Sequence, residues 1–575
     1  MEWLEWSDEA FATARKRGAP VLLYLKASWC RWCRELETRV FDDPRVVATL
    51  ASQFVAVRVD KDRRPDIDAR YSRGGWPTIA YLDESGELIA RDSFLEADEL
   101  LARLDLVAGY WADNKERVRR RLTEASDACA APARARGELS HQILDDVAHS
   151  LLETADPVHG GWGAQHKFPH PEGLDYALLR WSQTGDEAMR KLVLRTLRNM
   201  QAGEIHDRVE GGFYRYATAA DWSGPHHEKV LDSNAQRLYA YLEGYQALGE
   251  ASFRETAEGI LRWMDETLLD HETGAYRGSQ DASAAYAHLA TREARRAHGA
   301  PACDPTIFTN WNALAASSLF KASAVLDRPE LAERARGVLE FLFDELYDER
   351  VGMHHYWDGT YHLPGMLTDQ AHTLRALIDS VQFSGCTRSL ERAEHLAEIA
   401  ARTLASDDGG FWDMRHDPAA HGSLRRRTRS ILENSIQAEA LLRLSFFTRE
   451  LRWQALARET LASFASDYKR HGHLVAGYAR AVDLYLHPPV HVTIVGPAER
   501  DDTRHLRRAA LAPYVASRVV QVIDPLVERG RLERLGLPYE GGASRAYVSR
   551  GRESYAETSD PLRLPALMTR IERGA

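Results

Sequence analysis

At the N-terminus, short apolar runs alternate with stretches in which apolar residues recur every three or four positions. The runs at 21–26, 54–59 and 78–82 have the length of β-strands, and the stretches between them have the spacing of helices. Strands that alternate with helices are typical of an α/β domain. The charged residues 113–124 and the Ala/Arg-rich residues after them indicate a linker, which we place at 126–140.

Beyond the linker the pattern is helical and is interrupted by a recurring turn. In each turn, acidic or polar residues and glycine come before an aromatic or apolar residue, and amphipathic helices run between the turns. Since no helix pair can bury its apolar face alone, we expect six pairs to close into an (α/α)6 toroid over residues 141–487. An open solenoid is the alternative, but no capping repeats are evident. The six turns contain Gly160, Gly211, Gly274, Gly352, Gly409 and Gly472.

Apolar runs with strand character return after residue 487. They occupy 491–496, 519–523 and 545–549 and predict a small C-terminal α/β segment over residues 488–575. With 575 residues, 44% of them hydrophobic, the chain is long enough to bury two or more cores.

A pair of cysteines three positions apart follows the first predicted strand. Cys30 would lie at the N-terminus of a helix, where unpaired amide groups and the flanking Arg31 and Arg34 favour a thiolate. In this geometry one thiolate attacks a disulfide and the second thiol, Cys33, resolves the mixed disulfide. We therefore predict a redox site with Cys30 as the attacking thiol.

A second signal, Gly74-Gly75-Trp76-Pro77, lies about forty residues further along the chain. A thioredoxin domain keeps a proline at this place, usually cis, which packs beside the dithiol and leaves the backbone before it free to pair with an extended substrate. Pro77 is therefore grouped with the two cysteines as a catalytic candidate. The expected fold class is multidomain α/β and α: a thioredoxin-like domain over 1–125, the linker, the (α/α)6 toroid and the small C-terminal α/β segment.

Other roles for the two cysteines stay open. A zinc site needs four ligands, and the remaining cysteines, Cys129, Cys303 and Cys386, are isolated. Five cysteines are too few for a secreted protein built on disulfides. The serious rival is a thioredoxin fold whose dithiol merely packs. No metal and no cofactor are expected.

Charge and hydropathy narrow the classes of partner. The net charge of −11 is spread over interleaved basic and acidic residues, which argues against a nucleic-acid partner. No run of 18 apolar residues occurs, and the first residues lack the pattern of a signal peptide, so we expect a cytoplasmic protein without a membrane partner.

Loops at one end of such a toroid line a central cavity, so polar groups near the glycine turns are candidates for chemistry. His226 and Glu228 stand out, because imidazoles packed with a carboxylate rarely serve as a helix cap. Trp311 is the expected stacking platform for a sugar-like ligand and Asp369 its hydrogen-bond partner, with Asp413 as a further carboxylate. For each residue, a cap or a satisfied buried polar group is the alternative. Asn312 and Asn434 are further candidates with the same alternative.

Several motifs together resemble the spermatogenesis-associated protein 20 family. The resemblance covers nearly the whole chain. It implies an N-terminal thioredoxin-like domain joined to a six-hairpin glycosidase-like toroid that is similar to the N-acylglucosamine 2-epimerases. The resemblance implies no particular reaction, because the activity of the family is not established. Arg31 stands where the family usually has histidine, and Asp232-Ser233-Asn234 stands where it has Tyr-Asp-Asn. The motifs are Gly74-Gly75-Trp76-Pro77, Lys167-Phe168-Pro169, Gly211-Gly212-Phe213-Tyr214, Pro225-His226-His227-Glu228-Lys229 and Thr309-Asn310-Trp311-Asn312.

Three functions are consistent with these features. The first is a thiol–disulfide oxidoreductase whose toroid binds a ligand or partner; it would need a disulfide-bearing protein partner or a thioredoxin-type reductant. The second is a carbohydrate-active enzyme, of epimerase, isomerase or hydrolase type, with a regulatory thioredoxin domain and a carbohydrate ligand. The third is a non-catalytic binding scaffold.

Overall fold

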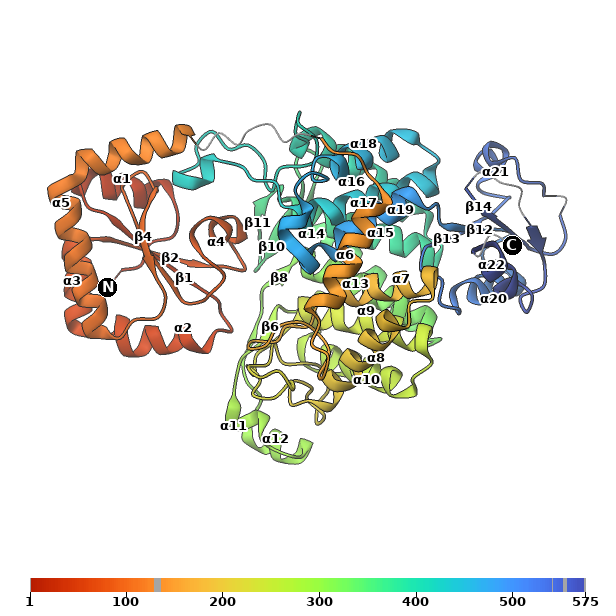
Figure 1. Ribbon diagram of the computed structural model, residues 1–575, viewed down its shortest axis with the longest axis horizontal. Coiled ribbons are helices and arrows are strands. Elements are labelled where there is room, and N and C mark those ends of the chain that lie inside the picture. The colour runs from red at the N-terminus through yellow and green to blue at the C-terminus, as the bar shows by residue number, and fades with distance from the viewer. Residues whose placement is uncertain (1, 129–135, 540, 552–555, 573–575) are drawn as a thin grey trace. The chain divides into compact units, whose positions relative to one another are not determined.

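The computed structural model describes residues 2–128, 136–539, 541–551 and 556–572. The chain divides into two compact units, of which unit 1 holds residues 1–134, 280–283 and 413–428, and unit 2 holds the rest (Figure 1). Unit 1 therefore contains two stretches that lie far from the N-terminus in sequence.

The predicted thioredoxin-like order is present in unit 1. Four strands form a sheet in the order β2-β1-β3-β4, with β1 parallel to β2 and antiparallel to β3. The first five residues of β1 are apolar or aromatic and buried, as expected for a strand that is covered on both faces. The elements are α1 (Asp8–Arg17), β1 (Val21–Lys26), α2 (Arg31–Leu36), α3 (Pro44–Gln53), β2 (Val55–Asp60), α4 (Pro65–Tyr71), β3 (Thr78–Leu82), β4 (Leu88–Asp92) and α5 (Ala97–Ala128).

The stretch 113–124, expected to belong to the linker, is helical. It continues α5, which packs along α3 and runs to Ala128 (Figure 1). No glycine or proline interrupts residues 110–128, so the helix continues through the charged stretch instead of ending before it. Residues 129–135 of the predicted linker, and Cys129 with them, lie outside the described residues.

Residues 413–428 complete the core of unit 1. Met414, Ala420 and Leu424 join the apolar cluster between the sheet and α1. The Arg70 guanidinium donates to the Asp413 carboxylate at 2.9 Å, and this pair is buried. A Cβ on Gly422 would lie 2.0 Å from the Gly86 carbonyl oxygen, so only glycine allows this approach.

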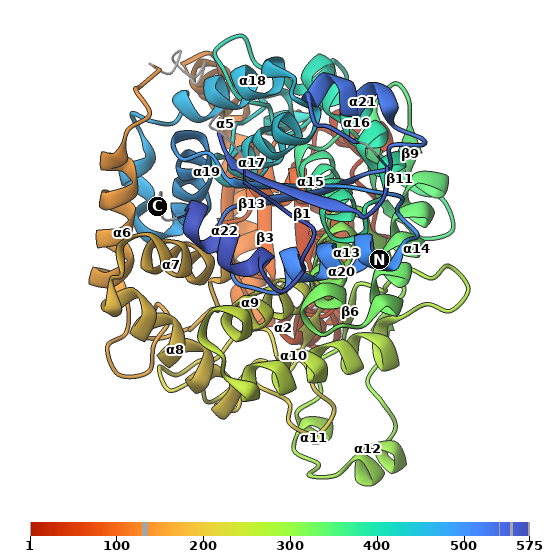
Figure 2. The same cartoon turned by 90° about the vertical axis from the view of Figure 1, so that its right-hand side faces the viewer.

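Unit 2 is a closed ring of helix pairs. Among the described residues, six inner helices pack in the cyclic order α7, α9, α13, α15, α17 and α19, and α19 packs against α7. The closed (α/α)6 toroid is therefore confirmed, and Figure 2 shows the outer helices around it. The inner helices are α7 (Pro171–Thr184), α9 (Leu231–Leu248), α13 (Thr309–Val325), α15 (Leu367–Ser384), α17 (Ile431–Thr448) and α19 (Ala476–Leu486). The outer helices are α6 (His141–Thr154), α8 (Glu187–Ala202), α10 (Ala251–Trp263), α14 (Pro329–Glu345), α16 (Thr387–Leu404) and α18 (Leu451–Ala462).

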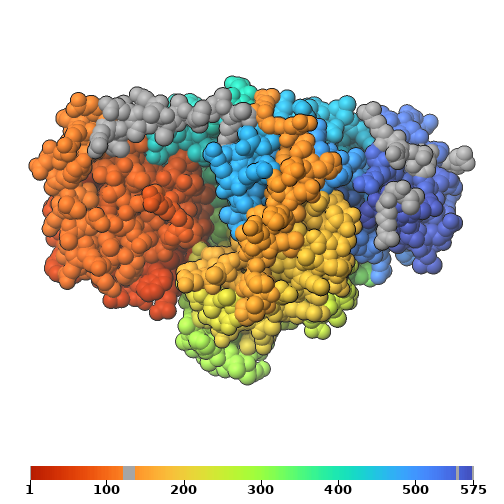
Figure 3. All heavy atoms as spheres, in the orientation of Figure 1, coloured from red at the N-terminus to blue at the C-terminus, as the bar shows by residue number. Residues whose placement is uncertain are grey.

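The first outer helix closes the ring. It lies on the surface of unit 2, across both the first hairpin and the last, so that α6 packs against α7 and α19 (Figure 3). The loops between the helices of the toroid contain short strands and helices. They are β5 (Lys229–Val230), β6 (Ser279–Gln280), α11 (Ala284–Ala287), α12 (Arg292–His298), β7 (Cys303–Asp304), β8 (Ile307–Phe308), β9 (Tyr347–Asp348), β10 (Gly352–Trp357) and β11 (Tyr361–Pro364).

A side-chain amide near the start of an inner helix holds each of several glycine turns. Asn434 accepts from the Phe411 backbone N–H at 2.6 Å and donates to the Phe411 carbonyl at 3.0 Å. Asn234 clamps Phe213 in the same way, and so does Asn312 with the backbone of the residue after its own turn. The turn therefore sits at a fixed place beside the inner helix that follows it.

The C-terminal segment is the predicted small α/β element. Its strands pair in the order β13-β12-β14-β15, with β12 parallel to β13. Residues just before β13 reach the toroid, where Arg480 of α19 donates to the Ser517 hydroxyl at 2.8 Å. The elements are β12 (Val490–Val495), α20 (Asp501–Leu511), β13 (Arg518–Ile523), α21 (Arg529–Leu535), β14 (Arg545–Arg550), β15 (Ala556–Thr558) and α22 (Leu564–Glu572).

Candidate functional site

Cys30 occupies the N-cap of α2, directly after β1. Its sulfur accepts the backbone N–H of Cys33 at 3.3 Å and lies 3.7 Å from the carbonyl oxygen of Trp76. The peptide bond between Trp76 and Pro77 is cis. The structure therefore brings the three predicted catalytic residues, Cys30, Cys33 and Pro77, to one place.

The two cysteines differ in exposure. Cys30 is 6% exposed and Cys33 is 1% exposed. Burial, together with the neighbouring Cys30, raises the pKa of the Cys33 thiol far above its usual range. Cys33 is therefore held as a thiol in this state, which suits a resolving group that reacts second.

Tyr24 of β1 lies next to the dithiol, and sequence reasoning did not predict a role for it. Its hydroxyl donates to the Cys33 carbonyl oxygen at 3.1 Å. Burial, with Cys33 and Glu37 nearby, raises the pKa of Tyr24 well above its usual value, so the phenol stays protonated. It appeared in the sequence only as one apolar member of a buried strand.

Two tryptophans flank the dithiol, and each is anchored by a carboxylate. Trp29 donates to Asp62 at 2.7 Å, and Trp76 donates to Asp68 at 2.8 Å. Burial raises the pKa of Asp68 above its usual value. Lys61 lies 4.6 Å from the centre of the Trp76 ring, so the wall beside the dithiol is aromatic and carries a cation.

The two arginines expected to favour the thiolate are placed differently. Arg31 lies near the ring of Trp32, which is 47% exposed. Arg34 donates to the Asp281 carboxylate at 2.8 Å and to the Ala282 carbonyl at 3.3 Å, both within unit 1. Since Arg34 has a carboxylate partner, less of its charge is directed at Cys30.

His226 and Glu228 lie together in unit 2. The His226 Nδ1 atom is 3.8 Å from Glu228, and the Arg215 guanidinium is 3.4 Å from the same carboxylate. The Tyr216 hydroxyl lies 2.8 Å from His226 Nε2, and the two rings stack. The structure thus joins these two predicted residues in a network with Arg215 and Tyr216.

The other three residues predicted for the cavity have different neighbours. Trp311 is buried against Phe308. Asp369 is buried beside His355, whose Nδ1 lies 3.0 Å from its carboxylate; burial raises the pKa of Asp369 although His355 opposes the shift. Asp413 belongs to unit 1, where it binds Arg70. None of the five predicted residues lines the axial chamber described next.

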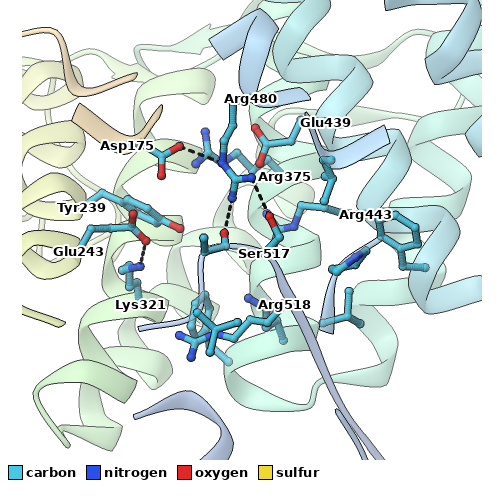
Figure 4. Close-up of a pocket in the computed structure, with 18 residues that line it drawn as sticks. Asp175, Tyr239, Glu243, Lys321, Arg375, Glu439, Arg443, Arg480, Ser517 and Arg518 are labelled. Carbon is cyan, nitrogen blue, oxygen red and sulfur yellow. Dashed lines mark hydrogen bonds and ion pairs between the residues drawn. The ribbon is translucent and has the colours of Figure 1, made fainter. Parts of the chain in front are cut away.

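A chamber of about 330 Å³ lies on the axis of the toroid, enclosed by the inner helices. Charged side chains from six inner helices gather at its floor or just below it. They are Asp175 (α7), Glu243 (α9), Lys321 (α13), Arg375 (α15), Glu439 (α17) and Arg480 (α19). A smaller cavity of about 60 Å³, bounded by residues 515–519, lies on the other side of these groups (Figure 4).

Ion pairs join part of this charged ring. Arg480 donates to Asp175 at 3.2 Å, and Lys321 binds Glu243 (Figure 4). Burial raises the pKa of Asp175 to about 7. Burial alone would also raise the pKa of Glu243, but Lys321 holds it below its usual value. Two neighbouring carboxyl groups thus have different protonation behaviour in one site.

The ring residues were missed because their sequence signal is weak. Each is one charged residue inside an amphipathic helix, and such a residue is indistinguishable from a solvated position until the inner face of the helix is known. The six charged residues indicate a common site only once the order of the inner helices around the ring is known.

Fold and site together define a protein class: a thioredoxin-like unit with a Cys-X-X-Cys motif, joined to an (α/α)6 toroid. The family model described as "Thioredox_DsbH: Protein of unknown function, DUF255" matches residues 1–129. The chain is similar to human spermatogenesis-associated protein 20, with 24% identity over 662 residues, 91% of this chain and 84% of that protein. This match confirms the resemblance that the motifs indicated. Matches to the rat and mouse counterparts take in 39% of each protein.

Two further similarities concern separate parts of the chain. A thiol:disulfide interchange protein DsbD of Vibrio vulnificus (strain CMCP6) is 30% identical over 112 residues, which are 18% of this chain and 19% of that protein. A solved sugar epimerase from a ruminal bacterium aligns with 60% of this chain and 97% of that one, at 13% identity and a TM-score of 0.49.

Two features are absent from the residues that the structure describes. Among them, no helix combines the length and the apolar character needed to cross a membrane. The same part of the chain contains no group of three or more His, Cys, Asp or Glu side chains that could hold a metal ion.

Proposed function

We propose that unit 1 catalyses thiol–disulfide exchange. The observation that supports this most is the position of Cys30, whose sulfur accepts an amide N–H at the start of α2 beside the loop of Pro77. An amide N–H and a helix N-terminus both stabilise negative charge on sulfur. The similarity of this region to DsbD, a thiol:disulfide interchange protein by name, supports the same chemistry.

The reaction has two exchange steps. The Cys30 thiolate attacks one sulfur of a substrate disulfide, forming a mixed disulfide and releasing the other substrate sulfur as a thiolate. Cys33 then loses its proton and attacks the Cys30 sulfur, which releases the second substrate thiol and leaves a Cys30–Cys33 disulfide. A dithiol reductant of thioredoxin type restores both thiols, so the partners are a disulfide-bearing protein and this reductant.

Trapping the mixed disulfide tests the assignment. The full-length Cys33→Ser variant, incubated with insulin as the disulfide-bearing probe, is expected to accumulate an adduct that dithiothreitol releases, at least ten times more than Cys30→Ser. The adduct is measured on non-reducing gels and by mass spectrometry. Cys303→Ser serves as the matched control, because this thiol is distant from the dithiol in sequence and lies in unit 2.

Two other outcomes of the trapping experiment would change the assignment. An adduct with Cys30→Ser alone would make Cys33 the attacking thiol. Adducts with neither variant would contradict the proposal and favour a dithiol that only packs.

For the toroid we propose ligand binding in the axial chamber. The observation that supports it is a cavity of about 330 Å³ that combines apolar walls with charged groups from several helices. Charged groups gathered in a cavity are common in binding sites and rare in cores that only pack. Catalysis on a carbohydrate would need a proton donor and acceptor there, and Asp175 and Glu243 are the candidates.

A further inference from the structure

We infer that unit 2 contains a second binding site, an arginine-lined pocket that takes a soluble organic phosphate. The pocket has a volume of about 370 Å³ and lies where the C-terminal segment meets the toroid, since α20 packs against α13 (Figure 2). None of its lining residues lines the axial chamber. This site is therefore independent of the ligand binding proposed for that chamber and of the chemistry of Cys30.

Arginine side chains dominate the lining of this pocket. Among the described residues, four arginines line it against two carboxylates, so the lining has an excess of two positive charges when His505 is neutral. Cations held close together repel one another, and a bound anion removes this repulsion. A phosphate monoester carries about 1.5 to 2 negative charges at neutral pH, which matches the excess. The arginines are Arg336, Arg504, Arg507 and Arg508, and the carboxylates are Asp327 and Glu333.

Two of the four arginines already have acidic partners. Arg508 binds Asp327, which also lines the pocket. Arg504 pairs with Asp501 and Glu499, which are both exposed and lie outside the lining. Exposed ion pairs of this kind are weak, typically below about 1 kcal/mol, so they leave both arginines able to turn toward an anion.

The other two arginines have no acidic partner in the part of the chain that the structure describes. No hydrogen bond or ion pair joins Arg336 to another described residue. Arg507 donates from Nη1 to the Ser384 carbonyl oxygen at 2.7 Å, at the end of α15, and its other donors have no partner among the described residues. Burial, together with Arg336 and Arg504, lowers the pKa of Arg507 below its usual value. Guanidinium groups present forked sets of donors that suit the oxygens of a phosphate, so both side chains are available to one.

Apolar side chains form another part of the lining. Ala332 of α14, Phe383 of α15 and Leu511 of α20 contribute to it, and each is buried. An inorganic ion would leave this surface against water, whereas the organic part of a phosphate ester covers it. The volume of about 370 Å³ lies at the lower end of the range for small-molecule sites, so we expect one small ester and not a polymer.

Calorimetric titration of the full-length protein tests this inference. The probe is phenyl phosphate, compared with inorganic phosphate and with benzoate. Phenyl phosphate is expected to bind at least tenfold more tightly than either, because inorganic phosphate lacks the apolar group and benzoate carries a single charge. Arg336→Gln is expected to weaken the binding of phenyl phosphate about tenfold, since it removes a charge-assisted contact.

Arg529→Gln is the matched control, because it makes the same change of charge at an exposed position of α21 outside the pocket. It should bind phenyl phosphate as the unaltered protein does. Thermal unfolding of both variants checks that they are folded, and Arg336→Gln should unfold at the temperature of the unaltered protein, since Arg336 has no partner among the described residues to lose.

Four outcomes would contradict the inference. Equal weakening by Arg336→Gln and Arg529→Gln would show that only the overall charge attracts the probe. Benzoate that binds as tightly as phenyl phosphate would overturn the phosphate as the ligand group. Binding to phosphatidylcholine vesicles that contain phosphatidic acid, without binding of phenyl phosphate, would assign the phosphate to a lipid instead of a soluble ester. Binding of neither the probes nor the vesicles would overturn the site itself.

Discussion

Three asparagine side chains make the same pair of hydrogen bonds at different turns of the toroid: Asn234, Asn312 and Asn434. Each amide bonds both the backbone N–H and the carbonyl of the residue after a glycine turn. Asn312 and Asn434 were considered as groups for chemistry, with a structural role as the alternative, and the structure favours the alternative. A carboxylate would lack the N–H donors that an amide supplies, which explains why asparagine occupies these places.

Asn434→Ala is expected to lower the free energy of unfolding by about 2–4 kcal/mol. The substitution removes both hydrogen bonds to Phe411 and leaves a buried N–H and a buried carbonyl without partners, at about 1–3 kcal/mol each. Urea unfolding of the full-length protein measures the change. Gln142→Ala, on the surface of α6, should stay within about 0.5 kcal/mol of the unaltered protein. An Asn434→Ala protein as stable as this control would show that the hydrogen bonds between Asn434 and Phe411 do not stabilise the fold.

At the scale of elements, the hydrophobic pattern was enough to predict the strands of unit 1 and the helix pairs of unit 2. The spacing of apolar residues and the position of turn residues are local properties, which can be read from a sequence. The floor of the chamber was not predictable. Asp175 and Arg480 lie in the first and last inner helices, and their pairing depends on ring closure, which no local pattern encodes.

Asp175→Asn tests the electrostatics of this floor. The carboxyl has a pKa of about 7 in the folded protein and about 3.8 when unfolded, so the folded state holds the proton more tightly between these values. Stability contributed by this group is therefore expected to fall as pH rises from about 4 to 7, by at most about 1.4 kcal/mol per pH unit.

The measurement is the free energy of unfolding against pH for Asp175→Asn and for the unaltered protein. Since asparagine does not titrate, the difference between the two curves should shift in favour of the variant as pH rises over this window. A difference that is constant with pH would show that Asp175 ionises normally in the folded protein.

At the scale of the whole molecule, unit 1 is assembled from three separate stretches of chain. Residues 280–283 and 413–428 were assigned from their sequence to the toroid, since they follow its glycine turns, yet they cluster with the thioredoxin-like residues. Arg34 and Arg70 hold them through Asp281 and Asp413. Contacts between residues so far apart in sequence follow from tertiary packing and leave no periodic signal, so they could not be predicted.

The central claim, that Cys30 is the reactive thiol, is tested most directly by site-resolved alkylation. The reduced full-length protein is treated with iodoacetamide at pH 7.5, and the modification of each cysteine is followed by mass spectrometry. Cys30 is expected to react at least tenfold faster than Cys33, because the thiolate is the nucleophile and burial raises the pKa of Cys33. In urea the two rates should converge. Alkylation of Cys33 as fast as Cys30 in the folded protein would contradict the account.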